Sequence, residues 1–347
     1  MEGMMKTAVM TDLKKVELQE RPIPAPAANE VLVKVEYVGV CGSDLHYYEH
    51  GRIGDFIVET PFVLGHEAGG TVVEVGADVK HLKVGDRVAL EPGKTCGECE
   101  FCKAGKYNLC EDVIFFATPP VDGVFQEYVA HEAALCFKLP ENVSTMEGAL
   151  IEPLAVGMHA ANQGGAHIGQ TAVVTGAGCI GLVSLLALKA MGVSKVIVVD
   201  IVEKRLQKAL ELGADYVING MAEDTVARIK ELTGGKGHDL GIETAGSQIT
   251  ASQLIKAAKK GATVVFVGYS PSGEMTLPIG MALDKELTFK TIFRYRNIYP
   301  TAIEAVATGK INIKDIVTNY FELDDIQNAL DECINNKAEI VKGVIKI

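Results

Sequence analysis

The chain has 347 residues, of which 48% are apolar and 22% charged, and its formal net charge is −12. This length exceeds the size at which one hydrophobic core usually stops growing, so we expect two domains with an ordinary globular composition. The acidic balance and the lack of concentrated lysine and arginine argue against nucleic acid as the principal partner. No apolar run reaches membrane-spanning length and no secretory signal precedes the first domain, so the sequence predicts no membrane partner and a cytoplasmic location.

Residues 6 to 90 show the pattern of short β-strands. Runs of β-branched residues predict strands over 31–38 and 71–76, and several prolines punctuate the approach to the first of them. Residues 84–89 predict a turn followed by another strand. Short strands with frequent glycines favour a small barrel or sandwich.

Polar side chains in this region are candidates for metal binding. Cys41 lies in a turn that also delivers Ser43 and His46, while His66 and Glu67 stand side by side just before a predicted strand. Neighbouring side chains on an extended chain point in opposite directions, so His66 and Glu67 reach one ion only if the backbone bends, which the glycines at 65, 69 and 70 permit. Taken singly, Cys41 also fits a small buried hydrophobe, and the His-Glu pair also fits an ordinary core or surface pair.

Four clustered cysteines form the strongest local motif. Cys96, Cys99 and Cys102 are separated by two residues each, and Cys110 follows after seven more. This spacing lets four sulfurs surround one tetrahedral ion and leaves no open position for a substrate, so it predicts a structural zinc. The alternatives are an iron–sulfur cluster with the same ligands or a site left empty, and disulfides are not expected in a reducing compartment.

A helical stretch over 140–157 carries Glu152 directly before Pro153. An apolar run precedes the carboxylate and a proline follows it, which favours a position at a break in the backbone. The alternative is an ordinary charge at a helix terminus, and the neighbours of Glu152 in space decide between the two.

From residue 172 onward, strands and helices alternate. A short apolar strand over 172–175 leads into a turn with Gly176, Gly178 and Gly181, an apolar helix follows over 182–191, and a second buried strand ends at Asp200. The glycines allow a tight turn, close approach of the backbone to a pyrophosphate and close packing of the helix on the strand. Because the helix N-terminus also offers amides to phosphates, the segment predicts a dinucleotide site.

Asp200 also indicates which dinucleotide is bound. Its carboxylate can accept hydrogen bonds from both hydroxyls of the adenosine ribose. A 2′-phosphate there would meet a like charge, at a cost of up to about 4 kcal/mol at contact for an effective dielectric constant near 20. NAD is therefore predicted over NADP, although Lys204 and Arg205 lie close enough in sequence to soften that preference.

Further strands over 215–218, 239–243 and 262–268 continue the alternation and predict an α/β fold with a doubly wound parallel sheet. In such a sheet ligands lie over the carboxyl ends of the strands, so residues 244–246 and 267–269 are candidate cofactor contacts. The tail is predicted to add helices over 302–308 and 323–335 and a strand over 341–347.

This order of parts resembles the medium-chain zinc dehydrogenases, and within them the sorbitol and xylitol dehydrogenase branch. The resemblance covers nearly the whole chain and is carried by residues 39–48, 51–56, 64–67, 117–120, 147–154 and 293–295. It implies a GroES-like, β-rich catalytic domain over residues 1–152 with a zinc lobe at about 91–112. It also implies a Rossmann NAD-binding domain over 153–292 and a return of residues 293–347 to the catalytic domain.

The resemblance further implies two zinc ions, one catalytic and one structural. The catalytic ion is expected on Cys41, His66 and Glu67 with water in its open position, and Glu152 is expected beside it, bonded to that water or, in some states, to the metal. Cysteines 96, 99, 102 and 110 are expected to hold the structural ion.

The remaining site residues also follow from matching positions. A proton relay is expected to begin at Ser43 and to reach His46 through the nicotinamide ribose, with Glu152 and the zinc water as an alternative route. For His46 itself, a buried, hydrogen-bonded histidine is the alternative. The positions matching substrate contacts are Tyr47, Glu152, Arg294 and Tyr295. The positions matching cofactor contacts are Ile180, Asp200, Arg205, Val267, Gly268, Tyr269, Ile292, Phe293 and Arg294.

The implied activity is the reversible, NAD-dependent oxidation of a secondary hydroxyl in a sorbitol- or xylitol-type polyol to the 2-ketose, by a homotetramer or, next, a dimer. Classical alcohol dehydrogenases have a third cysteine ligand that this chain lacks between Cys136 and Cys179, and threonine dehydrogenases lack the Glu-Pro-Leu context at residues 152–154. Another secondary alcohol, 2,3-butanediol or L-threonine dehydrogenase remains an alternative. A non-enzymatic, NAD-binding redox sensor is the alternative outside enzymes.

Overall fold

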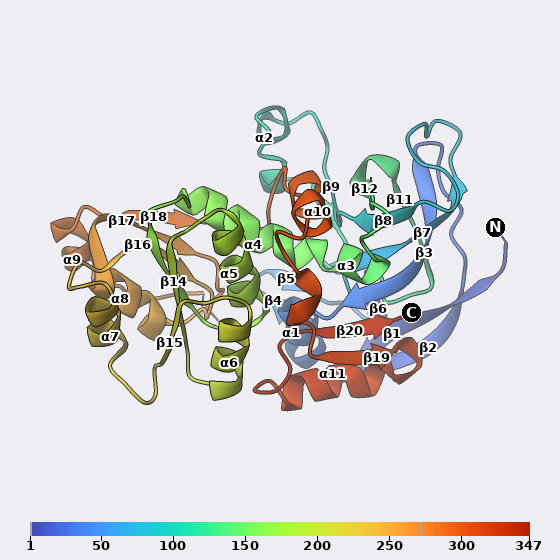
Figure 1. Ribbon diagram of the computed structural model, residues 1–347. Helices are drawn as coiled ribbons and strands as arrows, with labels where there is room; N and C mark the ends of the chain where they lie inside the picture. Colours follow the sequence, from blue (N-terminus) through green and yellow to red (C-terminus); the bar gives the residue numbers. More distant parts are fainter. Residues whose placement is uncertain (1, 271–272) are drawn as a thin grey trace. The chain divides into compact units, whose positions relative to one another are not determined.

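The computed structural model describes residues 2–270 and 273–347 (Figure 1). The chain forms two compact units, of which the first takes the described residues up to Glu152 together with Tyr299–Thr308 and Val317–Ile347. The second takes Pro153–Ile298 and Gly309–Ile316. Within the described ranges, none of the helices combines the length and the apolar character needed to span a bilayer.

The first unit is built around a mostly antiparallel sheet with the strand order β12-β8-β7-β3-β20-β19, in which β11 also pairs with β3. These strands are β3 (Glu30–Gly39), β7 (Glu67–Val75), β8 (Arg87–Leu90), β11 (Tyr128–Glu132), β12 (Cys136–Lys138), β19 (Asn319–Glu322) and β20 (Gly343–Lys346). The continuous apolar run of β3 is explained by its central place, since it pairs with β7, β11 and β20. The first and last parts of the sequence thus share one sheet, as the blue and red strands in Figure 1 show.

Smaller elements complete the first unit. A second sheet has the order β2-β1-β6, and two short hairpins pair β4 with β5 and β9 with β10. The strands are β1 (Met4–Asp12), β2 (Lys15–Pro22), β4 (Arg52–Ile53), β5 (Phe56–Ile57), β6 (Phe62–Val63), β9 (Gly93–Lys94) and β10 (Ile114–Phe115). The helices are α1 (Gly42–His50), α2 (Glu100–Lys103), α3 (Thr145–Ala149), α10 (Tyr299–Ala307) and α11 (Ile326–Asn335), with 3₁₀ turns η1 (Tyr107–Leu109), η2 (Ala133–Leu135) and η4 (Leu323–Asp325).

The second unit contains the predicted doubly wound sheet. Its order is β15-β14-β13-β16-β17-β18, and these neighbouring strands pair in parallel. The strands are β13 (Thr171–Thr175), β14 (Lys195–Asp200), β15 (Tyr216–Asn219), β16 (His238–Glu243), β17 (Ala258–Phe266) and β18 (Thr288–Thr291). The strand order reverses between β13 and β16, and ligands of such sheets bind at this switch point.

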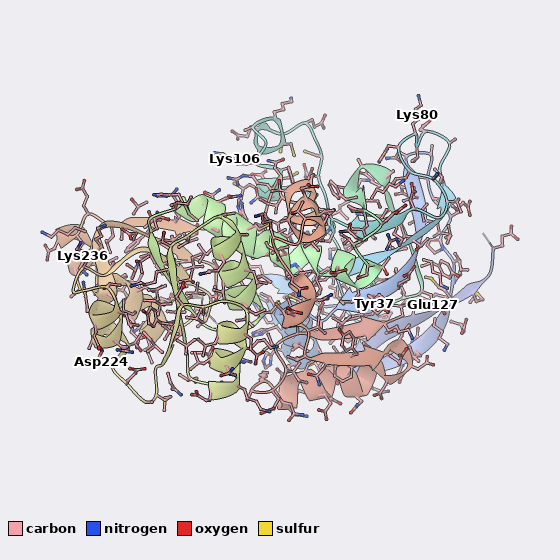
Figure 2. All side chains as sticks on the ribbon, in the orientation of Figure 1. Tyr37, Lys80, Lys106, Glu127, Asp224 and Lys236 are labelled. Atoms are coloured by element: carbon pink, nitrogen blue, oxygen red, sulfur yellow. The ribbon has the colours of Figure 1, made fainter. Side chains whose placement is uncertain are left out.

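Helices connect the strands of the second unit. They are α4 (Ile151–Gly164), which begins in the first unit, α5 (Cys179–Ala190), α6 (Glu203–Glu211), α7 (Thr225–Leu232), α8 (Gln248–Ala257) and α9 (Ile279–Asp284), followed by the 3₁₀ turn η3 (Ile313–Ile316). Local caps fix their starts: the side chain of Asp224, labelled in Figure 2, accepts a hydrogen bond of 2.9 Å from the Ala227 amide and so begins α7.

The turn and strand predicted over 84–89 are both present, since Gly85 lies in a turn with a φ of 91° and β8 starts at Arg87. The structure differs in detail from another sequence expectation. The predicted helix over 140–157 is two helices, α3 and α4, that meet at Leu150. The break therefore precedes Glu152 by two residues, and Pro153 lies in the first turn of α4, where its missing N–H removes no helical hydrogen bond.

Candidate metal centres and cofactor site

The fold brings together three polar side chains from two separate segments of the first unit. One ligand atom from each of Cys41, His66 and Glu67 lies within 4.8 Å of the others. A thiol, an imidazole and a carboxylate are the three protein ligand types that zinc accepts, and three protein ligands leave one tetrahedral position open. The donor set therefore fits a zinc site of the open, catalytic kind.

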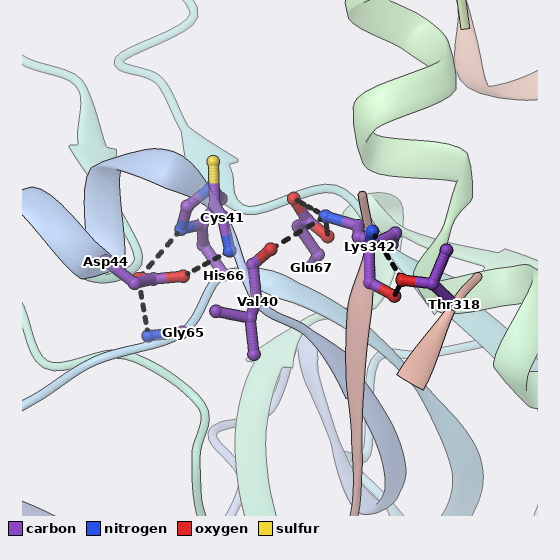
Figure 3. A network of polar contacts seen from close by, with 8 residues as sticks. All are labelled: Val40, Cys41, Asp44, Gly65, His66, Glu67, Thr318 and Lys342. Atoms are coloured by element: carbon purple, nitrogen blue, oxygen red, sulfur yellow. Dashed lines mark hydrogen bonds and ion pairs between the residues drawn. The ribbon is translucent and has the colours of Figure 1, made fainter. Parts of the chain in front are cut away.

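Two local features position these ligands. Cys41 is the N-cap residue of α1, and its amide donates a hydrogen bond of 3.0 Å to the Asp44 carboxylate (Figure 3). The other oxygen of Asp44 accepts a bond of 2.9 Å from the Gly65 amide, next to His66. One buried carboxylate thus ties together the two segments that carry the cysteine and the histidine.

Asp44 also faces the histidine ring. Its Oδ1 lies 3.5 Å from His66 Nδ1, so Nε2 is the nitrogen left for a metal. Complete burial acts to lower the pKa of the His66 imidazole, but Asp44 and the Cys41 thiol raise that pKa well above its ordinary value. These surroundings favour a positive charge at the site, whether a proton or a metal cation.

The bend predicted around His66 and Glu67 is supplied by one glycine only. Gly65 has a φ of 90°, a conformation that other residues rarely adopt. Gly69 and Gly70 lie inside β7 and serve close packing instead. A Cβ on Gly69 would lie 2.0 Å from the Thr145 carbonyl oxygen of α3, and one on Gly70 would lie 2.1 Å from the Lys34 carbonyl oxygen. Of the three glycines expected to permit the bend, Gly69 and Gly70 therefore lie within the strand, and Gly65 supplies the turn before His66.

Glu67 has a partner that the sequence did not reveal. Lys342, directly before β20, donates a hydrogen bond of 2.7 Å to Glu67 Oε1 and lies 2.5 Å from Oε2 (Figure 3). The same ammonium group donates a bond of 3.0 Å to the carbonyl oxygen of Val40, the residue before Cys41. Both side chains are 1% exposed, so this is a fully buried ion pair at the edge of the candidate metal centre.

The other predicted residues of the first unit lie on α1 and at the start of α4. Tyr47 is buried in α1, and its ring packs edge-on against that of Phe62 with 6.4 Å between the ring centres. Ser43 is half-buried. His46 is exposed, which excludes the fully buried alternative, and partial desolvation followed by the nearby His50 lowers its pKa. Glu152 is 5% exposed, so it is not a solvated charge at a helix end.

The four-cysteine cluster is also assembled. One sulfur from each of the cysteines at 96, 99, 102 and 110 lies within 4.8 Å of the others. Backbone amides point at the sulfurs, from Cys99 to Cys96 and from Cys102 to Cys99 at 3.4 Å each. Donors from Glu98 and Cys99 lower the pKa of the Cys96 thiol to about 7, which favours the thiolate that a metal requires. The set fits a closed, structural zinc site.

Tyr107 links this lobe to the sheet of the first unit. Tyr107, in η1, donates a hydrogen bond of 2.8 Å to the carboxylate of Glu91, which directly follows β8. Burial raises the pKa of Glu91 and the Tyr107 bond opposes that rise. Lys106, labelled in Figure 2, precedes Tyr107 on the same lobe.

In the second unit, the glycine turn has the geometry that a dinucleotide site needs. Gly176 has a φ of 91°, and a Cβ on Gly181 would lie 1.8 Å from the Gly176 carbonyl oxygen. Gly178 is the N-cap residue of α5, so Ile180 lies in the first turn of that helix. The turn thus needs glycine at two positions for steric reasons, and the helix N-terminus follows it directly.

Asp200 lies at the carboxyl end of β14, next to this turn. Its carboxylate accepts hydrogen bonds of 2.6 Å from the Ala177 amide and 2.7 and 2.9 Å from the Ile201 and Val202 amides. The anionic group is therefore held in place beside the glycine turn. Arg205 in α6 adjoins the turn as well, since a Cβ on Gly178 would lie 4.0 Å from its guanidinium.

The remaining predicted cofactor residues follow the carboxyl ends of the neighbouring strands. The buried carboxylate of Glu243 accepts bonds from the Ala245 and Gly246 amides at 3.0 Å each, and its backbone oxygen accepts bonds from Val267 and Gly268. Tyr269 is exposed, as is Phe293, while Ile292 and Arg294 are half-buried. All of these residues belong to one end of the parallel sheet.

The segment after β18 has an unusual backbone. Arg294 has a φ of 53°, in the left-handed region, and its guanidinium lies 4.8 Å from the centre of the Phe293 ring. Tyr295, the next residue, is 3% exposed. A non-glycine residue held in this conformation indicates strain that the surrounding structure maintains, as is common at functional sites.

Comparison with known proteins identifies the family. The model of the alcohol dehydrogenase GroES-like domain matches residues 27–141, and that of the zinc-binding dehydrogenase domain matches residues 179–308. The chain belongs to the zinc-dependent medium-chain dehydrogenases, in the sorbitol dehydrogenase branch. Members of this family are oxidoreductases that use NAD(H) and zinc, so the predicted fold, enzyme class and cofactors are confirmed.

Relatives cover almost the entire chain. Sorbitol dehydrogenase of Bacillus subtilis is 42% identical over 341 residues, which are 98% of this chain and 97% of that protein. Human sorbitol dehydrogenase is 46% identical over 318 residues, or 91% of this chain and 89% of that protein. A crystal structure from Escherichia coli, described as an oxidoreductase/dehydrogenase of unknown specificity, superposes with a TM-score of 0.95 at 43% identity and 99% coverage of both chains.

Proposed function

We propose that the chain is an NAD-dependent polyol 2-dehydrogenase that oxidises a secondary hydroxyl of a sorbitol- or xylitol-type polyol to the 2-ketose. The observation that carries the proposal is the donor set of half-buried Cys41 and buried His66 and Glu67, in a chain of which 91–98% is similar to sorbitol dehydrogenases. We assign these three residues to a catalytic zinc and the four-cysteine cluster to a structural zinc.

When bound, zinc supplies a Lewis acid and NAD supplies a hydride acceptor. The chain itself positions and exchanges protons. In our proposal Glu152 holds the water or hydroxyl nearest the metal by a hydrogen bond, and Ser43 Oγ accepts the proton of the reacting hydroxyl as its own hydroxyl proton leaves toward His46. His46, one helical turn further along α1, passes that proton to solvent, which suits an exposed imidazole.

Substrate and cofactor selection are assigned to polar side chains. Tyr47, Arg294 and Tyr295 are proposed to bind the further hydroxyls of the polyol, so that an apolar alcohol leaves them without hydrogen bonds. Asp200 is proposed to bind the adenosine ribose and to exclude a 2′-phosphate. The cofactor lies, in this proposal, over the carboxyl ends of β13, β14, β16 and β17.

We further propose a homotetramer, with a dimer as the next choice, in the cytoplasm. Every residue of the edge strand β18 is exposed, and Phe289 on it is a large apolar side chain. Such an exposed apolar edge strand is a usual place for subunit contact. Four thiols kept for a metal also require a reducing compartment.

The test is initial-rate oxidation of sorbitol, xylitol, ribitol, galactitol, L-threonine and 2,3-butanediol, with NAD and NADP in parallel. We expect a polyol to be preferred and NAD to be favoured over NADP. Preference for threonine or the diol would overturn the substrate assignment but keep the enzyme class. Preserved NAD binding without turnover of any of them would favour the redox-sensor alternative.

A further inference from the structure

The Glu67–Lys342 ion pair is built into the fold and is not a chance surface contact. The two residues are 275 positions apart in sequence, and β20 and β3 bring them together by pairing Val344 with Gly39. Gly39 provides the room, because a Cβ there would lie 1.9 Å from Glu67 Oε2 and 3.2 Å from Lys342 Cε. A substitution at Gly39 would therefore displace the pair.

The backbone of Lys342 is held from the opposite side. Thr318 donates a hydrogen bond of 3.0 Å from its amide to the Lys342 carbonyl oxygen, and its hydroxyl accepts one of 3.4 Å from the Lys342 amide (Figure 3). The ammonium group is further fixed by its bond to the Val40 carbonyl oxygen. Lys342 is thus pinned at its backbone and at its tip, and it cannot turn away from Glu67 without leaving a buried charge unpaired.

This geometry gives Glu67 two competing cations. Lys342 contacts both carboxylate oxygens of Glu67, and a metal on Cys41 and His66 requires one of the same oxygens. Two positive charges sharing one carboxylate repel each other, and burial strengthens that repulsion. Without the metal, by contrast, Lys342 is what compensates the buried Glu67.

We infer that Lys342 is a positioning residue that acts as a resident counter-cation for Glu67. It keeps the carboxylate in place in the zinc-free protein and weakens the hold of Glu67 on zinc, so that this ligand can exchange during turnover. The inference rests on the proposed ligand set of the catalytic zinc. Its consequence is counter-intuitive: removing Lys342 tightens zinc binding while it destabilises the zinc-free protein.

The experiment compares wild type with Lys342→Met in zinc affinity, by chelator competition, and in melting temperature with and without zinc. We expect zinc to bind at least tenfold more tightly to Lys342→Met, and the melting temperature of its zinc-free form to fall by more than that of its zinc-loaded form. Lys342→Gln, which keeps a hydrogen-bond donor but no charge, should shift zinc affinity in the same direction. Lys346→Met is the matched control, since Lys346 is an exposed lysine of β20 and should change neither quantity.

The double variant Glu67→Gln/Lys342→Met isolates the pair. Because it removes both charges, its zinc-free form should melt at a higher temperature than that of Lys342→Met, and the gain in zinc affinity should disappear. Unchanged or weaker zinc binding in Lys342→Met and Lys342→Gln would overturn the inference, as would a double variant that behaves like Lys342→Met.

Failure of the inference and failure of the proposed ligand set are distinguishable. Each wild-type chain is expected to release two zinc ions. The ion that Cys41→Ser lacks is the one whose affinity is compared between wild type and the Lys342 variants. If Cys41→Ser loses no zinc, the ligand set is wrong. If it loses one ion and the lysine variants do not alter that ion's affinity as stated, only the role of Lys342 is wrong.

Discussion

The two metal centres of the first unit are built in opposite ways. The four cysteines of the lobe lie within 15 consecutive residues, from Cys96 to Cys110, and their burial ranges from exposed Cys96 to buried Cys110. The ligands of the other centre come from two separate segments that Asp44 holds together, and Glu67 contacts a lysine from the far end of the sequence. A local centre needs only its own ligands at the right spacing, whereas the buried centre depends on partners that only the complete fold supplies.

The largest effect is expected from breaking the buried centre. Cys41→Ser should lose one of two zinc ions and lower kcat for the polyol by roughly a thousandfold or more, because the loss of the Lewis acid removes several kcal/mol of transition-state stabilisation. Zinc content and initial rates measure both effects. Cys333→Ala, at a buried cysteine outside both centres, is the control and should retain both ions and most of the activity.

Loss of a zinc ligand in the cysteine lobe should lower stability more than catalysis. Cys99→Ser should also lose one zinc ion, but its loss should appear mainly as a melting temperature lower by about 10 °C, on the estimate that roughly 3 kcal/mol of metal-linked folding energy is lost. The kcat of the remaining folded protein should change by less than about threefold, or about 0.7 kcal/mol. A thousandfold loss of kcat in folded Cys99→Ser would remove the distinction between the two centres.

A smaller effect is expected from the carboxylate that orients the buried ligands. Asp44→Asn keeps the size of the side chain but weakens its interactions with His66 Nδ1 and with the Cys41 and Gly65 amides. We expect a loss of about 10–100-fold in zinc affinity or activity, as is usual for partners of metal-bound histidines. Asp78→Asn, at an exposed aspartate, should leave both unchanged, and equal values for Asp44→Asn and wild type would refute the role.

The smallest effect concerns the link between lobe and sheet. Tyr107→Phe removes the hydrogen bond to Glu91 and should lower stability by about 1–2 kcal/mol, since it leaves a buried carboxylate without that donor. Hydrogen exchange should show faster opening of residues 95–111 with zinc content unchanged. Tyr320→Phe, at an exposed tyrosine, is the control. Faster exchange throughout the first unit would mean that the bond does not act locally.

The sequence predicted sites whose residues are neighbours in the chain better than sites that depend on contacts between distant segments. The cysteine lobe and the glycine turn with Asp200 were predictable because their residues are neighbours in sequence and their spacing is dictated by local geometry. Asp44 was missed as a partner of His66, although its place three residues after the N-cap Cys41 is a signal that helix-capping rules contain. Gly69 and Gly70 could not be distinguished from Gly65, because a glycine needed for close packing looks the same in sequence as one needed for a bend.

The sequence alone could not reveal Lys342 as a partner of Glu67. No spacing rule connects it to Glu67, and only the pairing of β20 with β3 brings the two together. Long-range contacts of this kind are set by the whole sheet.

The most direct measurement is anomalous diffraction at the zinc absorption edge from crystals of the wild-type protein. Two peaks are predicted for each chain, one enclosed by the four cysteine sulfurs and one within bonding distance of Cys41 Sγ, His66 Nε2 and a carboxylate oxygen of Glu67. If crystals of protein that oxidises polyols show a single peak, in the cysteine lobe, the assignment of the buried centre as the catalytic zinc site is contradicted.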